Sequence, residues 1–173
     1  LDTMAENIKR YYKSYNRSIQ HKLLHAILSK NPYFFEKLVI ELLAKMGYKG
    51  TQGLAYQTQK SNDGGIDGVI NKDPLGTSTI YIQAKRYRKV DKVNKNDIKN
   101  FYTSIRDQHS SKGVFITTSS FNSGAVREAK RHSIILINGK RLTTLMFKYE
   151  VGVRIQHIYK IAKVDSDFFS NGN

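Results

Sequence analysis

Cysteine is absent from this 173-residue chain, which excludes disulfide bonds and any zinc site built on thiolates. The five histidines show neither H-x-H nor H-E-x-x-H spacing, so a histidine metal site is not expected either. No apolar run is long enough for a membrane-spanning helix, and the basic N-terminus lacks the apolar stretch of a signal peptide. These absences predict a cytoplasmic protein without membrane contact.

Acidic side chains are scarce. The chain has 14 Asp and Glu residues against 29 Lys and Arg residues, which gives a formal net charge of +15 and an isoelectric point near 9.9. Such a surface favours a polyanionic partner. A glycine-rich loop ending in Gly-Lys-Ser/Thr is also missing, so hydrolysis of ATP or GTP is not expected. The length and a hydrophobic content of 39% fit one domain with a single packed core.

The most informative segment that is present is Asp-Gly-Gly-Ile-Asp-Gly at residues 63–68, which is followed by Gln83-Ala84-Lys85 at the end of a β-branched and aromatic run from Thr79. The composition of this run predicts a strand. Its period of two places Gln83 and Lys85 on one face and turns Ala84 towards a core. An amide oxygen and an ammonium group should therefore project together from one strand.

A second strand at residues 66–70 is predicted to carry Asp67, with the loop at 73–76 as a hairpin turn between the two strands. The glycines around Asp67 leave room for a metal ion and a phosphate group. This arrangement suits hydrolysis of a polyanion. The alternative is an ordinary ion pair between Asp67 and Lys85, with Gln83 as an ordinary strand amide.

The pattern D-G-G-I-D-G followed by Q-A-K-R resembles the Mrr-like branch of the PD-(D/E)XK nucleases, with Gln83 where most of that superfamily has Glu or Asp. The resemblance covers about residues 31 to 150, and its other ordered blocks are N-P-Y-F-F-E at 31–36, M-G-Y at 46–48, K-G-V-F-I-T-T at 112–118 and I-N-G at 137–139. It implies an α/β, restriction-endonuclease-like fold with a mixed central β-sheet flanked by helices.

The resemblance also implies a magnesium site, in which Mn²⁺ can substitute. The ligands would be the Asp67 carboxylate, the side-chain oxygen of Gln83 and the main-chain carbonyl of Ala84, which are all hard oxygen ligands. Lys85 would orient or deprotonate the attacking water and offset charge on the phosphorane. Glu36 would hold a metal-bound water. Asp63 could act similarly, although a hydrogen bond that caps the glycine turn is favoured for it.

Glu36 lies in a helix that should begin with Asn31 as N-cap and Pro32 at the first position, and end near Met46. From the residues alone, a glutamate in the first turn is best explained by the helix dipole. The resemblance reverses this preference, because the family's helix glutamate follows a phenylalanine in the same way. Glu36 thus joins Asp67, Gln83 and Lys85 as the expected catalytic set.

Basic residues leave the catalytic strand and enter the next helix with few acidic residues between them, and they are expected to line a groove for double-stranded DNA. They are Arg86, Arg88, Lys89, Lys92, Lys95 and Lys99. Residues at the end of another apolar strand are expected to donate hydroxyl or amide hydrogen bonds to phosphate, although helix capping alone would explain several of them. They are Thr117, Thr118 and Ser119.

Three regions are expected: a basic helical segment or linker at 1–30, the nuclease domain at 31–150 and an extension at 151–173 packed on that domain. No acidic residue occurs from Asn7 to Phe35, so the first segment reads either as a phosphate-contacting arm or as a solvated helix that packs one apolar face on the core. Both can hold on opposite faces. Residues 153–164 are expected to add an edge strand. Other elements are expected near 96–107, 113–118, 123–132, 134–138 and 141–149.

The leading functional hypothesis is a magnesium-dependent DNA endonuclease that acts in type IV restriction of modified or foreign DNA. The alternatives are a Holliday-junction or branched-DNA nuclease, the cutting module of another restriction system, and a DNA-binding module that keeps the fold without cutting. The resemblance further implies a homodimer, because cutting both strands needs two active sites, and a separate N-terminal DNA-recognition domain that is missing from this chain.

Overall fold

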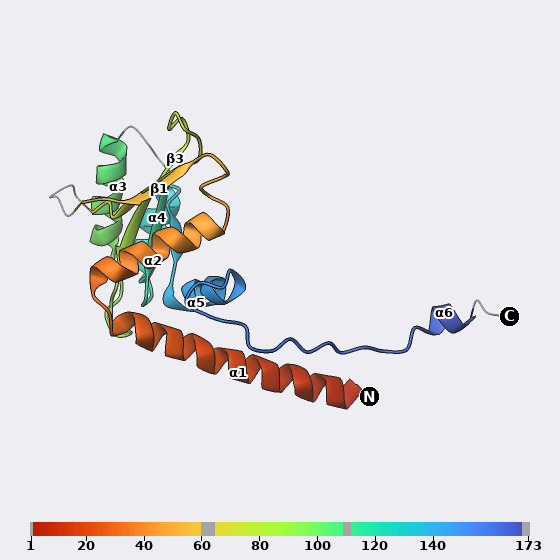
Figure 1. The fold of residues 1–173 in the computed structure, drawn as a ribbon. Coiled ribbons are helices and arrows are strands. Elements are labelled where there is room, and N and C mark those ends of the chain that lie inside the picture. The colour runs from red at the N-terminus through yellow and green to blue at the C-terminus, as the bar shows by residue number, and fades with distance from the viewer. Residues whose placement is uncertain (1, 60–64, 109–111, 171–173) are drawn as a thin grey trace.

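The computed structural model describes residues 2–59, 65–108 and 112–170 (Figure 1). Its centre is one five-stranded sheet in the order β1-β2-β3-β4-β5. β2 pairs antiparallel with both β1 and β3, and β4 and β5 continue parallel to β3. The strands are β1 Leu54–Gln57, β2 Gly68–Asn71, β3 Thr79–Lys85, β4 Gly113–Thr117 and β5 Ile135–Ile137. The predicted mixed sheet is confirmed.

Helices cover both faces of this sheet (Figure 1). The helices are α1 Asp2–Leu28, α2 Pro32–Lys45, α3 Lys95–Asp107, α4 Ser123–Arg131, α5 Gly139–Lys148 and α6 Ser166–Ser170. One buried core joins side chains of α1, α2 and α5 to one face, and a second core joins α3 and α4 to the other. The α/β architecture expected from the sequence is therefore present.

The start of α2 is set by Asn31 and Pro32, the two residues from which it was predicted. The Asn31 side chain accepts a hydrogen bond from the Phe34 amide at 2.8 Å, and Pro32 occupies the first turn, where a missing amide hydrogen costs nothing. The helix closes with Met46 as its C-cap. Both predicted boundaries are confirmed, but Glu36 lies on the second turn of this helix and not on the first turn, where the sequence placed it.

The alternation of β3 is as expected on its core side, where Ile80, Ile82 and Ala84 join the core shared with α2. Tyr81 on the opposite face packs against the core shared with α3 and α4. Gln83 is also covered, with 5% of its surface exposed. On this face of β3, Gln83 is therefore buried between the partly exposed Tyr81 and Lys85.

The predicted hairpin between β2 and β3 is confirmed, and Asp73 organises its turn. The Asp73 carboxylate accepts hydrogen bonds from the backbone amides of Leu75, Thr77 and Ser78 at 3.0 to 3.1 Å. The strand begins at Gly68, however, so Asp67 precedes β2 rather than lying within it. This places Asp67 at the same edge of the sheet as the end of β3.

The C-terminal extension differs from the expectation. Val151 is buried and Val153 packs in part against the core, but residues 154–170 are exposed and pair with no strand of the described chain. The predicted edge strand at 153–164 is therefore wrong, and packing on the domain ends at Val153. Beyond it the chain leaves the domain on the same side as the N-terminal end of α1 and runs opposite to the chain direction of that helix (Figure 1). None of the described helices has the length and apolar character needed to cross a membrane.

Candidate active site

The backbone of Asp67 is held between two strands. Its amide donates to the Ile82 carbonyl of β3 at 2.8 Å, and its carbonyl accepts from the amide of Thr58, just after β1, at 3.0 Å. One carboxylate oxygen, Oδ2, accepts hydrogen bonds from the Ala84 amide at 2.8 Å and from the Gln83 side-chain amide. The structure therefore brings together the three residues that the sequence proposed as metal ligands, while Asp63 lies outside the described residues.

Glycine is required beside Gln83. Gly65 has a φ of +98°, and a Cβ atom placed there would lie 2.2 Å from Gln83 Oε1. A Cβ atom on Gly68 would lie 2.6 Å from Ile40 Cδ1 of α2. The two glycines thus allow the loop to close over the Gln83 oxygen and allow α2 to approach β2.

Glu36 is fixed by a residue that the sequence did not single out. Gln57, the last residue of β1, donates from Nε2 to Glu36 Oε2 at 2.7 Å and to the Tyr33 carbonyl at 3.0 Å. The register of β1 places Gln57 opposite Gly68, beside Asp67. The four-residue strand LAYQ was not predicted. Its exposed positions are Leu54 and Tyr56, so the sequence carries no alternation of apolar and polar residues that could have found it.

The charges around Asp67 are close enough to change its ionisation. Burial raises the pKa of Asp67 to about 6, and the negative charge of Glu36 adds to this rise, while the Ala84 hydrogen bond, the positive charge of Lys85 and the Gln83 hydrogen bond oppose it. Two carboxylates and one ammonium therefore act on one partly buried centre. Such mutual repulsion between carboxylates is what a bound cation would relieve.

Lys85 ends β3 and remains partly exposed. Its carbonyl accepts hydrogen bonds from Thr117 Oγ at 2.8 Å and from the Tyr87 amide at 3.0 Å. These bonds hold the backbone of Lys85 against β4, two residues along from Gln83 on the same face of the strand.

The three hydroxyl residues at the end of β4 do not serve as predicted. Thr117, Thr118 and Ser119 are buried, with 0%, 5% and 7% of their surface exposed. Their hydroxyls donate to the carbonyls of Lys85, Tyr87 and Lys89, respectively. The expected contacts with phosphate are corrected to a structural role, in which β4 clamps the chain that follows the catalytic strand.

Arg86 also points elsewhere than expected. Its guanidinium Nη1 donates to the Leu28 carbonyl at the end of α1 at 2.7 Å, and its Nε is buried without a hydrogen-bond partner in the described part of the chain. A side chain committed to a helix terminus is poorly placed to contact DNA. The residue therefore links α1 to the strand that carries Lys85.

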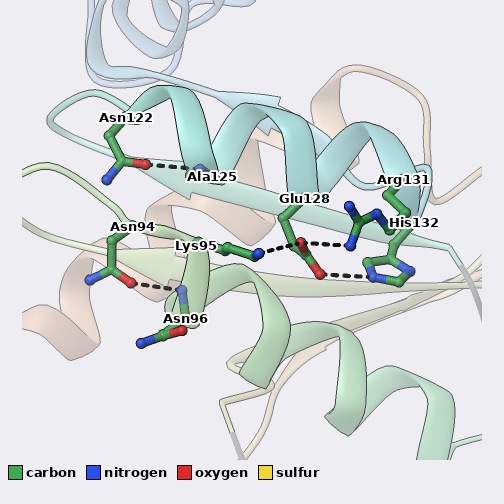
Figure 2. Close-up of polar contacts among 8 residues, drawn as sticks. All are labelled: Asn94, Lys95, Asn96, Asn122, Ala125, Glu128, Arg131 and His132. Carbon is green, nitrogen blue, oxygen red and sulfur yellow. Dashed lines mark hydrogen bonds and ion pairs between the residues drawn. The ribbon is translucent and has the colours of Figure 1, made fainter.

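The other basic residues of the predicted groove are exposed at the surface. They are Arg88, Lys89, Lys92, Lys95 and Lys99. Arg88 pairs with Asp91 at 3.0 Å, and Lys95 lies 3.8 Å from Glu128 (Figure 2). Their contact with DNA stays a prediction.

Within the ranges that the structure describes, no three His, Cys, Asp or Glu side chains gather as a metal-binding cluster. The candidate site accordingly has two carboxylates, Asp67 and Glu36, and one amide, Gln83. A cation held here would rely on oxygen ligands of low total charge, as the replacement of a carboxylate by Gln83 predicts.

Comparison with known proteins places this geometry in context. The restriction endonuclease family Mrr_cat matches residues 27–146 of the chain. The type IV methyl-directed restriction enzyme EcoKMrr of Escherichia coli (strain K12) is 34% identical over 165 residues, which cover 95% of this chain and 53% of that protein. The chain thus spans about half the length of this curated relative.

Two solved structures share the fold. The DNA modification-dependent restriction endonuclease AspBHI superposes with a TM-score of 0.61 at 23% identity, covering 78% of this chain and 36% of that one. The MspJI restriction endonuclease, solved with a 27-mer oligonucleotide, gives a TM-score of 0.57 at 22% identity, covering 77% of this chain and 31% of that one. At these identities the likeness supports the architecture.

Proposed function

The chain belongs to the Mrr_cat family of restriction endonucleases, and on that premise we propose that it is a divalent-metal-dependent nuclease that hydrolyses phosphodiester bonds in double-stranded DNA. One observation supports this most strongly. Asp67, Gln83 and the Ala84 backbone meet through direct hydrogen bonds at the end of β3, with Lys85 next in the strand and the charge of Glu36 acting on Asp67.

The residues present fit a magnesium ion. Asp67, Gln83 and the Ala84 carbonyl offer hard oxygen atoms, which Mg²⁺ prefers. Gly65 leaves room beside Gln83 Oε1 that a Cβ atom would fill. The Gln83 amide nitrogen faces Asp67 in this structure, so its oxygen reaches a shared cation only after the amide turns over. When bound, the ion supplies polarisation of the scissile phosphate and a lower pKa for an attacking water.

The remaining chemistry belongs to side chains of this chain. Lys85 orients the attacking water or takes its proton, and its positive charge offsets the charge that grows on the phosphate as the new bond forms. Glu36 accepts a hydrogen bond from a water at the site, and Gln57 keeps that carboxylate in place. The Thr117 hydroxyl holds the backbone of Lys85 in place by donating to the Lys85 carbonyl.

The biological setting that we propose is type IV restriction, which destroys modified or foreign DNA. The relative EcoKMrr is described as methyl-directed, and the basic surface of this chain suits a DNA substrate. We also propose that cleavage of both strands takes two copies of the chain, because each copy carries one candidate site.

Plasmid cleavage tests the function. Purified protein is incubated with methylated and unmethylated plasmid in Mg²⁺, Mn²⁺ or EDTA. We expect cleavage only with a divalent metal, and a loss of about 100-fold or more in Lys85→Ala, because the group that stabilises the transition state is removed. Lys45→Ala, at an exposed position in the last turn of α2, is the matched control and should cleave like the wild type.

Binding separates the nuclease from a non-cleaving module. Lys85→Ala should retain DNA affinity within a few-fold while losing cleavage. A wild-type protein that binds DNA tightly but never cleaves it with either metal would show that this chain is a binding module. Faster cleavage of methylated plasmid would support type IV restriction by this chain.

A further inference from the structure

The N-terminal half of α1 stands away from the domain. Figure 1 shows that α1 passes beneath α2 and α5 and that its first turns extend beyond them. The second half is anchored, because Leu23 and Ile27 are buried in the core and Gln20 donates to Thr144 of α5 at 3.2 Å. Residues 8–15 are all exposed. The N-terminal half of α1 therefore presents a surface that is not used for packing within the domain.

This free half carries a cluster of positive charge. Lys9, Arg10, Lys13 and Arg17 recur at spacings of one, three and four residues, which places them along one side of the helix. Together with Glu6 and Ser14 they line a shallow hollow. Among the residues that line this hollow, Glu6 is the one that is acidic. We call these four cations the basic face of α1.

The C-terminal end of α1 lies beside the candidate site, so distances along the helix relate the basic face to that site. Arg86 donates to the Leu28 carbonyl at 2.7 Å, so the end of α1 lies next to the residue that follows Lys85. A helix rises about 1.5 Å per residue, which puts Arg17 about 17 Å and Lys9 about 29 Å along the axis from Leu28. At about 3.4 Å per base pair, this corresponds to about five to eight base pairs of duplex.

We propose that the basic face of α1 binds the phosphate backbone of duplex DNA on one side of the cut site. This inference rests on the proposed nuclease function, because it concerns DNA that occupies the same site. Charge complementarity carries it: four cations on one exposed helix face meet a polymer with one negative charge per 1.7 Å of its axis. The contact is independent of base sequence, since it is made to phosphates. It holds the duplex in register with Lys85.

Two charge-matched variants test the proposal. In the first, Lys9, Arg10, Lys13 and Arg17 are all changed to Ala. In the control, the same number of exposed lysines elsewhere is changed to Ala, namely Lys45, Lys72, Lys140 and Lys148. Binding to a duplex of about 24 base pairs is measured by fluorescence anisotropy in EDTA over a series of salt concentrations, and circular dichroism confirms that both variants fold.

We expect the basic-face variant to bind about 10- to 100-fold more weakly, with the slope of log affinity against log salt reduced by about 2 to 3, because each lost phosphate contact removes about 0.9 from that slope. The control should stay within about 3-fold of the wild type. Equal losses in both variants, or an unchanged affinity in the first, would overturn the proposal. A change in self-association without a change in DNA affinity would assign the face to a protein contact and overturn it too.

The absence of cysteine allows a second readout. Ser14→Cys places a unique thiol within the basic face, and Gln52→Cys places one at an exposed loop position. With a photoreactive label on that thiol, the first should crosslink to DNA and the second should not. Metal-dependent cleavage of plasmid is scored separately. If the wild type cleaves plasmid but the basic-face variant binds DNA as tightly as the wild type, this inference alone is refuted. If the wild type never cleaves but the basic-face variant loses DNA binding, the nuclease function is refuted and the DNA-binding face stands.

Discussion

At the scale of single residues, the candidate site depends on a carboxylate whose ionised form destabilises the fold of the metal-free protein. Asp67 is partly buried near Glu36, and its pKa rises to about 6. Its unfolded-state value is near 3.9. The folded protein therefore binds a proton between these two values that the unfolded chain does not bind, so this group favours folding as the pH falls from 7 towards 4.

Asp67→Asn should therefore stabilise the metal-free protein while abolishing cleavage. An amide keeps an acceptor for the Ala84 amide but carries no charge to desolvate. We expect the free energy of unfolding at pH 7.5 in EDTA to rise by about 1 to 3 kcal/mol, as measured by denaturant titration. The gain should shrink as the pH is lowered towards 4. A variant no more stable than the wild type at pH 7.5 would contradict this account of the site.

Gln57 should act on the reaction through Glu36. Gln57→Leu removes the donor to Glu36 Oε2, so that carboxylate loses its fixed orientation. We expect cleavage to fall by about 10- to 100-fold and the Mg²⁺ concentration for half-maximal rate to rise, as for other partners that orient residues at a metal site. Gln52→Leu, at an exposed loop position, is the control. An unchanged metal dependence in Gln57→Leu would show that the contact is only structural.

At the scale of elements, α3 and α4 are joined by a cluster around one buried carboxylate. Glu128 of α4 lies 3.8 Å from Lys95 of α3, 3.4 Å from Arg131 and 3.1 Å from His132 (Figure 2). His132 in turn stacks on Tyr102 of α3, with ring centroids 3.6 Å apart. Burial alone would raise the pKa of Glu128, but the His132 hydrogen bond and the surrounding cations lower it on balance.

Glu128→Gln should loosen this helix pair. Because the folded-state pKa is lowered, the carboxylate stabilises the fold above its unfolded pKa, and that contribution disappears as the pH falls through the lower folded value. We expect the Tm at pH 7 to drop by a few degrees in a thermal melt, and the difference from wild type to vanish in acid. Glu41→Gln, on the exposed side of α2, is the control. A constant difference at all pH values would refute the charge-based explanation.

Two elements show how local pattern and tertiary context diverge. Residues 153–164 have the β-branched composition of a strand, yet they run exposed, because a strand needs a partner for its backbone groups and none of the described strands offers one here. The strand β1 is four residues long and gives too weak a pattern to predict, yet it pairs along its whole length with β2. Pairing, rather than composition, decided both outcomes.

At the scale of the whole molecule, charge and shape divide the protein into two parts. The sheet and its helices hold the candidate site at the end of β3, while the free half of α1 carries part of the net charge of +15 away from that body. A nuclease that cuts a long polyanion gains affinity from cations placed several base pairs from the cut, because each neutralised phosphate releases counterions. The Arg86 contact with the Leu28 carbonyl joins the two parts at their junction.

The sequence by itself determined most of the elements around the site, with β1 as the exception, and it proposed the central residues of that site. The helix from Asn31, the strand with Gln83 and Lys85 and the following turn carry strong local signals, namely capping, period-two alternation and turn residues. Those signals depend on residues that are neighbours in the chain, so they can be read without knowledge of the fold. The family likeness to Mrr-type enzymes was likewise readable from ordered motif blocks.

Only the tertiary structure decided which polar groups were already engaged. The hydroxyls of Thr117, Thr118 and Ser119 donate to carbonyls about 30 residues away, Arg86 reaches the end of α1, and Gln57 reaches Glu36. Hydrogen bonds between distant segments leave no periodic trace in the sequence, because any polar side chain could make them once the fold brings a partner near. The motif that indicates the chemistry can therefore be read from local sequence, whereas tertiary packing decides which side-chain hydrogen-bond donors remain available for DNA.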